Sequence, residues 1–333
     1  MALDPVSLAR DLIDIDSTTG VEGDVGAWLA RLLRDQGYQV VEHPVSDGRF
    51  NVFAYLDAPQ VVLSTHFDCV PPFFPSRQER GFLFGRGSCD AKGILAAQVV
   101  AAERLRARGE SRVGLLFVVG EERGSDGARA ADRCAPEGVR YLINGEPTDN
   151  RLGSATRGVL RVRLRAEGRA AHSAFPELGD SAIDKLLDAL MVIRGVELPD
   201  DPLLGRTHYT VGFIEGGVAP NVVSPLASAE LLFRTVGDAG AVRAALAVVE
   251  GLVTVEPALD MPAVRMHTIP GFDTAVFPYT TDVPWLGNWG VPLLFGPGSI
   301  HVAHTDDEHI AIDELKAAVG LYEELALRLL RGS

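Results

Sequence analysis

The stretch that decides the fold is VGLLFVVGEE, residues 113–122. It begins with an apolar run, residues 113–119, and ends in two adjacent glutamates, Glu121 and Glu122. A short run that is apolar on both faces is typical of a buried strand in a parallel sheet. Ligands of open α/β sheets bind beyond the carboxyl ends of the strands. We therefore predict that these two carboxylates point into a crevice.

Three more segments are predicted to bring polar side chains to the same edge of the sheet. Two of them are apolar runs, and the third is a glycine-rich loop. Their polar residues are His66 and Asp68 after residues 61–65, Asp90 within residues 85–93, and Glu146 after residues 141–144. One histidine and several carboxylates from four segments are the donors that a site for divalent metal ions requires.

The composition limits the class of protein. With 333 residues, 47% of them hydrophobic, the chain is long enough for two domains. A net charge of -14 argues against nucleic acid and anionic membranes as partners. No apolar stretch approaches the roughly 20 residues of a membrane span, no signal peptide is apparent, and three cysteines cannot form a disulfide framework. We expect a cytoplasmic protein.

The patterns along the chain predict two domains. Helix and strand patterns alternate up to about residue 156, which favours a mostly parallel sheet with helices on both faces. The following segments have the order βαββαβ, which is the ferredoxin-like arrangement. We predict an α/β catalytic metal-binding domain, residues 1–156 and 266–333, with an inserted lid or dimerisation domain at residues 157–265. Such an insertion permits hinge motion.

The expected elements follow from these periodicities. The expected helices are residues 6–15, 21–36, 92–108, 128–134, 180–193, 239–250 and 312–330, and the expected strands are 39–42, 51–56, 61–65, 113–119, 141–144, 159–166, 207–214, 229–235, 252–257 and 291–295.

Each polar residue also has a simpler interpretation. A histidine at a strand end is more often a hydrogen-bonded residue than a ligand, Asp90 fits the N-cap of the next helix, and a Glu-Glu pair is usually a solvated turn. Adjacent carboxylates repel each other unless a cation lies between them, and this pair directly follows a buried strand. Since neighbours on extended backbone face different ways, one glutamate can bind metal while the other stays free as a base.

Asp68 lies two residues after His66, so both side chains point to the same side of an extended chain. A carboxylate there can accept the second ring proton of a metal-bound histidine and fix its tautomer. Cys69 and Cys89 each adjoin a proposed site residue, and small buried packing residues are favoured over thiolate ligands there.

Taken together, these segments resemble the zinc-dependent family that includes acetylornithine deacetylase, succinyl-diaminopimelate desuccinylase, aminoacylase and carboxypeptidase G. The resemblance covers nearly the whole chain. It rests on STHFDCVP (64–71), GRGSCDAKG (85–93), GEE (120–122), GEPT (145–148), GRAAHS (168–173) and the terminal Ala303-His304. His301 and His309 are rivals of His304 for the last position.

The resemblance implies two divalent metal ions, zinc first, with cobalt or manganese as alternatives. The implied roles are Asp90 as the bridge between the metals, His66 and Glu146 on one metal, Glu122 and His304 on the other, Glu121 as the general base, and Asp68 as the group that orients His66.

The resemblance also implies roles in the inserted domain. His172, which composition alone would place on the surface, corresponds to a lid histidine that reaches the substrate carbonyl. Asn221 and Arg234 correspond to lid residues that grip a substrate carboxylate. An exposed sheet edge must be covered or paired, and pairing with a twofold copy is one solution. A homodimer in which His172 serves the other subunit is expected, with a monomer as the alternative.

The implied reaction is hydrolysis of the amide bond of an N-acyl amino acid. The segment GPGSI, residues 296–300, looks most like the acetylornithine and acetylcitrulline deacetylase branch of arginine biosynthesis. A dipeptidase or aminopeptidase, or a succinyl-diaminopimelate desuccinylase, with the same metal centre is the competing enzyme. A non-catalytic metal- or peptide-binding protein is the alternative of another class, and Glu121 argues against it because a pure binder has no use for an unligated base.

Overall fold

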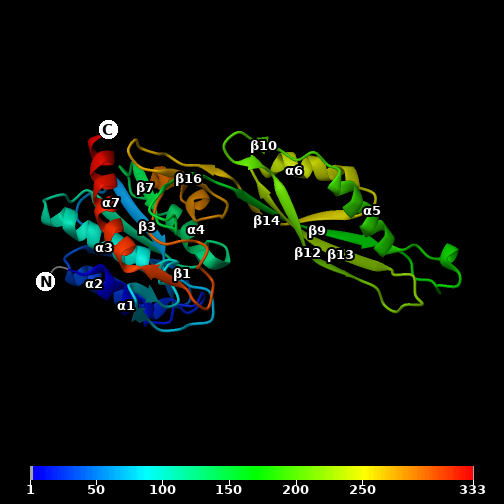
Figure 1. Cartoon of the computed structure of the whole chain (residues 1–333), viewed down its shortest axis with the longest axis horizontal. Coiled ribbons are helices and arrows are strands. Elements are labelled where there is room, and N and C mark those ends of the chain that lie inside the picture. The colour runs from blue at the N-terminus through cyan, green and yellow to red at the C-terminus, as the bar shows by residue number, and fades with distance from the viewer. Residues whose placement is uncertain (1–2, 333) are drawn as a thin grey trace. The chain divides into compact units, whose positions relative to one another are not determined.

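The structure is a computed structural model, and it describes residues 3–332 (Figure 1). The chain divides into two compact units. The first holds the residues up to Ser154, Met266–Ala275 and those from Thr281 onward, and the second holds Ala155–Arg265 and Val276–Thr280. The short segment Val276–Thr280, which the sequence assigned to the metal-binding domain, groups with the second unit because Val276 packs against its apolar cluster of Ala155, Leu204 and Val236.

A nine-stranded mixed sheet forms the centre of the first unit, and the predicted α/β class is confirmed. Its strand order is β1-β2-β6-β3-β7-β17-β8-β15, and β16 also pairs with β8. The neighbours β6, β3, β7 and β17 run parallel, whereas the pairs β1–β2, β2–β6, β17–β8 and β8–β15 are antiparallel. The bounds are β1 Gln39–Ser46, β2 Arg49–Tyr55, β3 Val61–His66, β6 Val113–Val118, β7 Tyr141–Asn144, β8 Leu152–Thr156, β15 Val264–Arg265, β16 Thr274–Phe277 and β17 Val291–Leu294.

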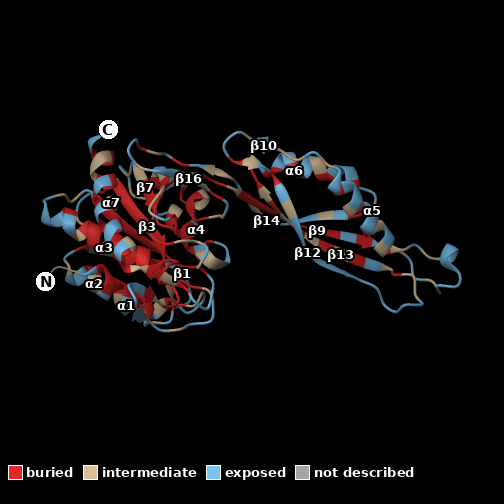
Figure 2. Ribbon diagram, in the orientation of Figure 1, coloured by how far each residue is buried: buried red, intermediate tan, exposed pale blue. Residues whose placement is uncertain are grey.

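Both faces of this sheet are covered, because alternate residues of its central strands enter different apolar clusters. Leu115 packs with helices on one face, and Leu116 packs with Trp289 and residues of α4 on the other. The strands β3 and β6 are buried at every position (Figure 2). The helices of the first unit are α1 Pro5–Ile13, α2 Gly23–Asp35, α3 Lys92–Ala107, α4 Asp126–Asp132 and α7 Ile312–Arg331.

The second unit has the ferredoxin-like arrangement. Its antiparallel sheet has the order β12-β13-β9-β14, with α5 and α6 packed on one face. Along β9, Leu160, Val162 and Leu164 are buried while the arginines between them are exposed, so the other face of this sheet is polar. The bounds are β9 Gly158–Glu167, α5 Ala182–Arg194, β12 His208–Gly216, β13 Leu226–Thr235, α6 Ala239–Leu246 and β14 Thr254–Met261.

All the expected helices and strands form within the described residues, with shifts at their ends. The helix expected at 239–250 ends at Leu246, and the strand expected at 252–257 continues to Met261. The sequence missed β8, β15 and β16, a small sheet of β4 Arg77–Glu79, β5 Phe82–Phe84 and β18 His309–Ala311, and the pair β10 Asp200–Asp201 and β11 Gly205–Arg206. Strands of two or three residues, such as β4, β5 and β15, carry no periodicity that a sequence pattern can reveal. Among residues 3–332, no helix is long and apolar enough to cross a membrane.

Candidate functional site

The proposed site residues of the first unit follow the parallel strands at the centre of the sheet. His66 is the last residue of β3, Glu121 and Glu122 follow β6, and Glu146 lies two residues beyond β7. Because β6, β3 and β7 are parallel neighbours, their carboxyl ends meet at one edge. Asp90 lies just before α3.

Four of the five proposed ligands are in contact. His66 Nε2 lies 3.0 Å from Asp90 Oδ1, and His304 Nε2 lies 3.4 Å from Asp90 Oδ2 and 3.0 Å from Glu122 Oε1. One ligand atom from each of His66, Asp90 and Glu122 lies within 4.8 Å of the other two. The two oxygens of Asp90 therefore face two different histidines.

Asp68 organises more of this site than its spacing predicted. His66 Nδ1 lies 3.0 Å from the backbone oxygen of Asp68 and 3.4 Å from its carboxylate. The same carboxylate accepts hydrogen bonds from the backbone N–H groups of Glu121 and Glu122, at 3.1 and 3.2 Å, and from the hydroxyl of Thr19. Burial alone would raise the pKa of Asp68, but His66, the Thr19 hydroxyl and the N–H of Glu122 together outweigh this effect and lower it.

The pair Glu121 and Glu122 lies on a short 3-10 turn, Glu121–Arg123, and the expectation of extended backbone was wrong. Gly120 precedes the turn with φ +76°, a left-handed conformation that glycine adopts without steric cost. The turn aims both backbone N–H groups at Asp68, and the side chain of Glu122 lies 3.0 Å from His304 Nε2.

Buried negative charge is concentrated here. Burial raises the pKa of Glu121 and of Glu146 well above the usual range, and it also raises the pKa of Glu122. Glu146 is 4% exposed, and no described residue forms a hydrogen bond with its Oε1. Carboxylates that repel one another and keep unpaired oxygens are stabilised by a cation. The nitrogen and oxygen donors present therefore fit divalent metal ions of the zinc type.

The second unit holds the other three proposed residues, and it brings only two of them together. His172 pairs with Val222 in an isolated β-bridge, and the N–H of Ser173 donates to the backbone oxygen of Asn221. Both His172 and Asn221 are exposed. Arg234 pairs with Val159, at the opposite end of β13 from this loop.

The separation of Arg234 from the other two residues follows from the register of the strands. Leu226, which starts β13 next to the loop, pairs with Glu167. At about 3.4 Å per residue, the strand from Leu226 to Arg234 spans roughly 27 Å. A substrate group gripped by both Asn221 and Arg234 of one chain is therefore not supported.

Comparison with known proteins decides the family. Residues 62–328 match the model of peptidase family M20/M25/M40. The chain belongs to this family. A probable carboxypeptidase of Aspergillus fumigatus is 37% identical over 376 residues, which cover 96% of this chain and 85% of that protein. As a member of the M20/M25/M40 family, the chain is a hydrolase of the metallopeptidase and amidohydrolase type.

Solved structures share this M20 fold. The aminopeptidase PepT of Bacillus cereus matches with a TM-score of 0.82 and 21% identity over 97% of both chains. The YXEP protein of Bacillus subtilis, described as a dinuclear metal-binding peptidase of the M20 family, matches with a TM-score of 0.75 and 16% identity over 98% of this chain and 97% of that one.

The rivals of the proposed ligands in this M20 chain have other surroundings. His309 packs its ring against Phe82 and Phe84. His301 is exposed. The N-cap of α3 is Ala91 rather than Asp90, and no side chain caps that helix end.

The two cysteines beside the site are packing residues in the structure. Burial raises the pKa of the Cys69 thiol to about 12 and also raises the pKa of Cys89. Neither belongs to the group of donors that could hold a metal among the described residues.

Sequence reasoning missed Asp282, which is 1% exposed. Burial raises its pKa to about 7. Its negative charge contributes to the raised pKa values of Glu121 and Glu146. An isolated aspartate before Val283-Pro284 gives no sequence signal of a site residue, because only the fold brings it near Glu121 and Glu146.

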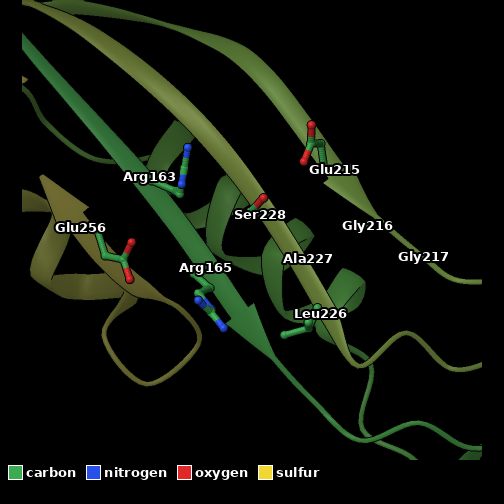
Figure 3. Close-up of a pocket in the computed structure, with 9 residues that line it drawn as sticks. All are labelled: Arg163, Arg165, Glu215, Gly216, Gly217, Leu226, Ala227, Ser228 and Glu256. Carbon is green, nitrogen blue, oxygen red and sulfur yellow. The ribbon is translucent and has the colours of Figure 1, made fainter. Parts of the chain in front are cut away.

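A hollow lies in the second unit, on the polar face of its sheet (Figure 3). It has a volume of about 490 Å³, and Arg163 and Arg165 project into it from β9 beside Glu256. Arg163 already pairs with Glu230, and Arg165 with Glu167. The hollow lacks histidine and cysteine, so it is not a second metal centre of the type found in the first unit.

Proposed function

We propose that this chain uses two divalent metal ions to hydrolyse the amide bond between an acyl group and an amino acid that carries a free carboxylate. N-acyl amino acids such as N-acetylornithine have this linkage. So does the last peptide bond of a short peptide, which agrees with the relative named a probable carboxypeptidase. The observation that carries the proposal is Glu121, whose carboxylate pairs with no side chain of residues 3–332, beside the cluster of His66, Asp90, Glu122 and His304.

The proposed metal ligands divide into two groups around Asp90. His66 and Glu146 would hold one ion, and Glu122 and His304 the other, with one oxygen of Asp90 toward each histidine. Zinc is proposed first, with cobalt or manganese as alternatives. When bound, such ions polarise a carbonyl and lower the pKa of water.

Glu121 is the proposed proton carrier. A general base works best when its pKa lies near the working pH, and burial together with the charge of Glu146 raises the pKa of Glu121. Glu121 would take a proton from the attacking water and deliver it to the nitrogen of the leaving amine. The hydrogen bond from its own N–H to Asp68 holds its backbone in place during this transfer.

Arg234 is the proposed partner of the substrate carboxylate. It is half-buried, and no carboxylate of the described residues forms an ion pair with it. Burial and the nearby Arg157 lower its pKa, so an anion would relieve an unfavourable environment. The planar fork of a guanidinium matches a carboxylate.

A homodimer would explain why His172 and Asn221 lie far from Arg234 within one chain. The strand β12 is the edge of its sheet, and it exposes Phe213 and Ile214. An open apolar edge favours pairing with a second copy. In such a dimer, His172 would act on the substrate bound by the other subunit, while Arg234 would act within its own.

The substrate class is tested with the metal-loaded protein and a short panel. The panel contains N-acetylornithine, N-acetylcitrulline, N-succinyl-diaminopimelate, a dipeptide with a free amine and the same dipeptide with an acylated amine. We expect faster hydrolysis of the N-acyl amino acids and of the dipeptide with an acylated amine than of the dipeptide with a free amine. The Glu121→Gln protein, purified identically, is the control for contaminating hydrolases.

The pattern of activity separates the candidates. Preference for N-acetylornithine or N-acetylcitrulline would support the deacetylase branch and a role in arginine biosynthesis. Preference for the acylated dipeptide would support a carboxypeptidase, and preference for the free dipeptide an aminopeptidase or dipeptidase. Activity no higher than that of Glu121→Gln on every compound would contradict the proposal and favour a binding protein.

A further inference from the structure

A buried glutamate joins two loops of the metal centre. Glu308 lies four residues after His304 and is 1% exposed. Its Oε1 accepts hydrogen bonds from three backbone N–H groups of the loop that carries Asp90, namely those of Gly87 at 3.0 Å, Cys89 at 3.1 Å and Asp90 itself at 3.0 Å. One carboxylate oxygen therefore holds the backbone on the N-terminal side of Asp90.

Arg86 completes this connection. Its side chain is 2% exposed, and its Nη1 donates to Glu308 Oε2 at 2.6 Å and to the backbone oxygen of Thr305 at 3.1 Å. Its Nε donates to the backbone oxygen of Pro72 at 3.2 Å. The Arg86–Glu308 pair thus links the loop of Asp90 to the loop of His304 through both a side-chain ion pair and backbone contacts.

A buried ion pair that holds two loops together carries a large desolvation cost. Glu308 is 1% exposed and Arg86 2%, so both charges have been removed from water. Apolar packing can hold buried segments at a smaller electrostatic cost. A carboxylate oxygen fixes the direction of three converging N–H groups, and apolar packing does not.

We infer that Glu308, held by Arg86, is a positioning residue that fixes Asp90 relative to His304. The inference rests on the proposed metal centre. Asp90 Oδ2 and His304 Nε2 lie 3.4 Å apart, and both belong to loops that the Arg86–Glu308 pair joins. Groups that orient metal ligands usually contribute about 10- to 100-fold to metal affinity.

The test compares two buried glutamates that pair with arginine. Glu308→Gln keeps the shape of the side chain but removes its charge. Glu323→Gln is the matched control, because Glu323 is 4% exposed and pairs with Arg104 and Arg108 at 3.3 and 3.1 Å, and neither arginine belongs to the proposed metal centre. Each metal-free protein is titrated with Zn²⁺ by calorimetry, and the absorption spectrum is recorded with Co²⁺.

We expect Glu308→Gln to bind Zn²⁺ about 10- to 100-fold more weakly than wild type and to change the Co²⁺ spectrum. Glu323→Gln should bind as wild type does, even if both variants melt at a lower temperature. Equal affinity and identical spectra in all three proteins would overturn the inference, and so would equal weakening in both variants. If the wild type itself bound no Zn²⁺, the result would refute the proposed metal centre, on which this inference rests.

Arg86→Lys is the second variant and serves if Glu308→Gln does not fold. It keeps the positive charge but loses the fork that reaches Thr305 and Pro72. We expect weaker Zn²⁺ binding in the same direction, with a smaller loss because the three N–H groups keep their acceptor. Wild-type affinity in this variant would count against a positioning role of the pair.

Discussion

His304 Nε2 lies 3.0 Å from Glu122 Oε1, although 182 positions separate the two residues in the chain. His304 also has φ +63°, in the left-handed region that residues other than glycine seldom adopt. Such conformations cluster at functional sites, where the surrounding structure holds them. The backbone of this loop is therefore shaped to aim one imidazole at the carboxylates.

The first prediction concerns metal content. Elemental analysis of metal-saturated wild-type protein should give about two divalent ions per chain, because the donors divide into two groups around Asp90. His66→Ala combined with His304→Ala should lose tight binding, since each group loses its nitrogen donor. His309→Ala is the control and should keep the wild-type content, because His309 packs against Phe82 and Phe84. Unchanged binding in the double variant would refute the site.

The second prediction separates the base from the ligand. Glu121→Gln cannot take a proton, so kcat should fall by about 10²- to 10⁴-fold, the usual contribution of general-base catalysis. Its metal content should stay near that of wild type. Glu122→Gln should instead lose metal, because Glu122 contacts His304. The assignment is wrong if Glu121→Gln keeps nearly full activity.

The third prediction concerns the metal-free protein and pH. Hydrogen bonds to Asp90 and Glu122 raise the pKa of His304 from 6.5 to about 10. A raised pKa means that protonated His304 stabilises the fold fully below pH 6.5, and that this contribution is lost as the pH rises through about 10. The Tm difference between wild type and His304→Ala should shrink over this range in chelator-treated samples. A difference that is constant with pH would contradict the ion-paired state.

The fourth prediction tests whether His172 acts on the other subunit. His172→Ala and Glu121→Gln proteins should each be nearly inactive. A mixed dimer holds one site in which both residues are intact, so mixing the two proteins should restore part of the activity.

The control for this experiment is a mixture of Glu121→Gln with His66→Ala. Both residues belong to the first unit, so no site of that mixed dimer is complete and no recovery is expected. Subunit exchange is verified with differently tagged chains. Lack of recovery despite exchange would exclude action between subunits, and a monomer in sedimentation would exclude the dimer.

Much of the fold could be read from local patterns. The strands β3, β6 and β7 are continuous apolar runs, and a run buried on both faces needs no distant information to be recognised. For the same reason, polar residues that directly follow such runs can be predicted to lie at the edge of the sheet where the carboxyl ends of these strands meet. Short strands such as β4 and β18 escaped, because each has three residues and takes its conformation from its neighbours.

Other parts of the site depend on contacts between distant segments. Asp282 and Glu308 are buried carboxylates, yet nothing in their local sequence distinguishes them from surface acids. Their environment is set by loops that arrive from elsewhere in the chain. A sequence pattern records the period of apolar residues, and an isolated charge in a loop has no period.

The sequence by itself determined the α/β core with helices on both faces of its sheet, the ferredoxin-like insertion and the types of donor at the edge of the sheet, because these follow from periodicity and strand ends. Only the tertiary structure shows that His304, rather than His301 or His309, contacts Asp90 and Glu122. These three histidines lie within nine residues, and the direction of each side chain is set by the φ and ψ angles of the loop. Those angles are held by long-range contacts such as the Arg86–Glu308 pair, which no local pattern encodes.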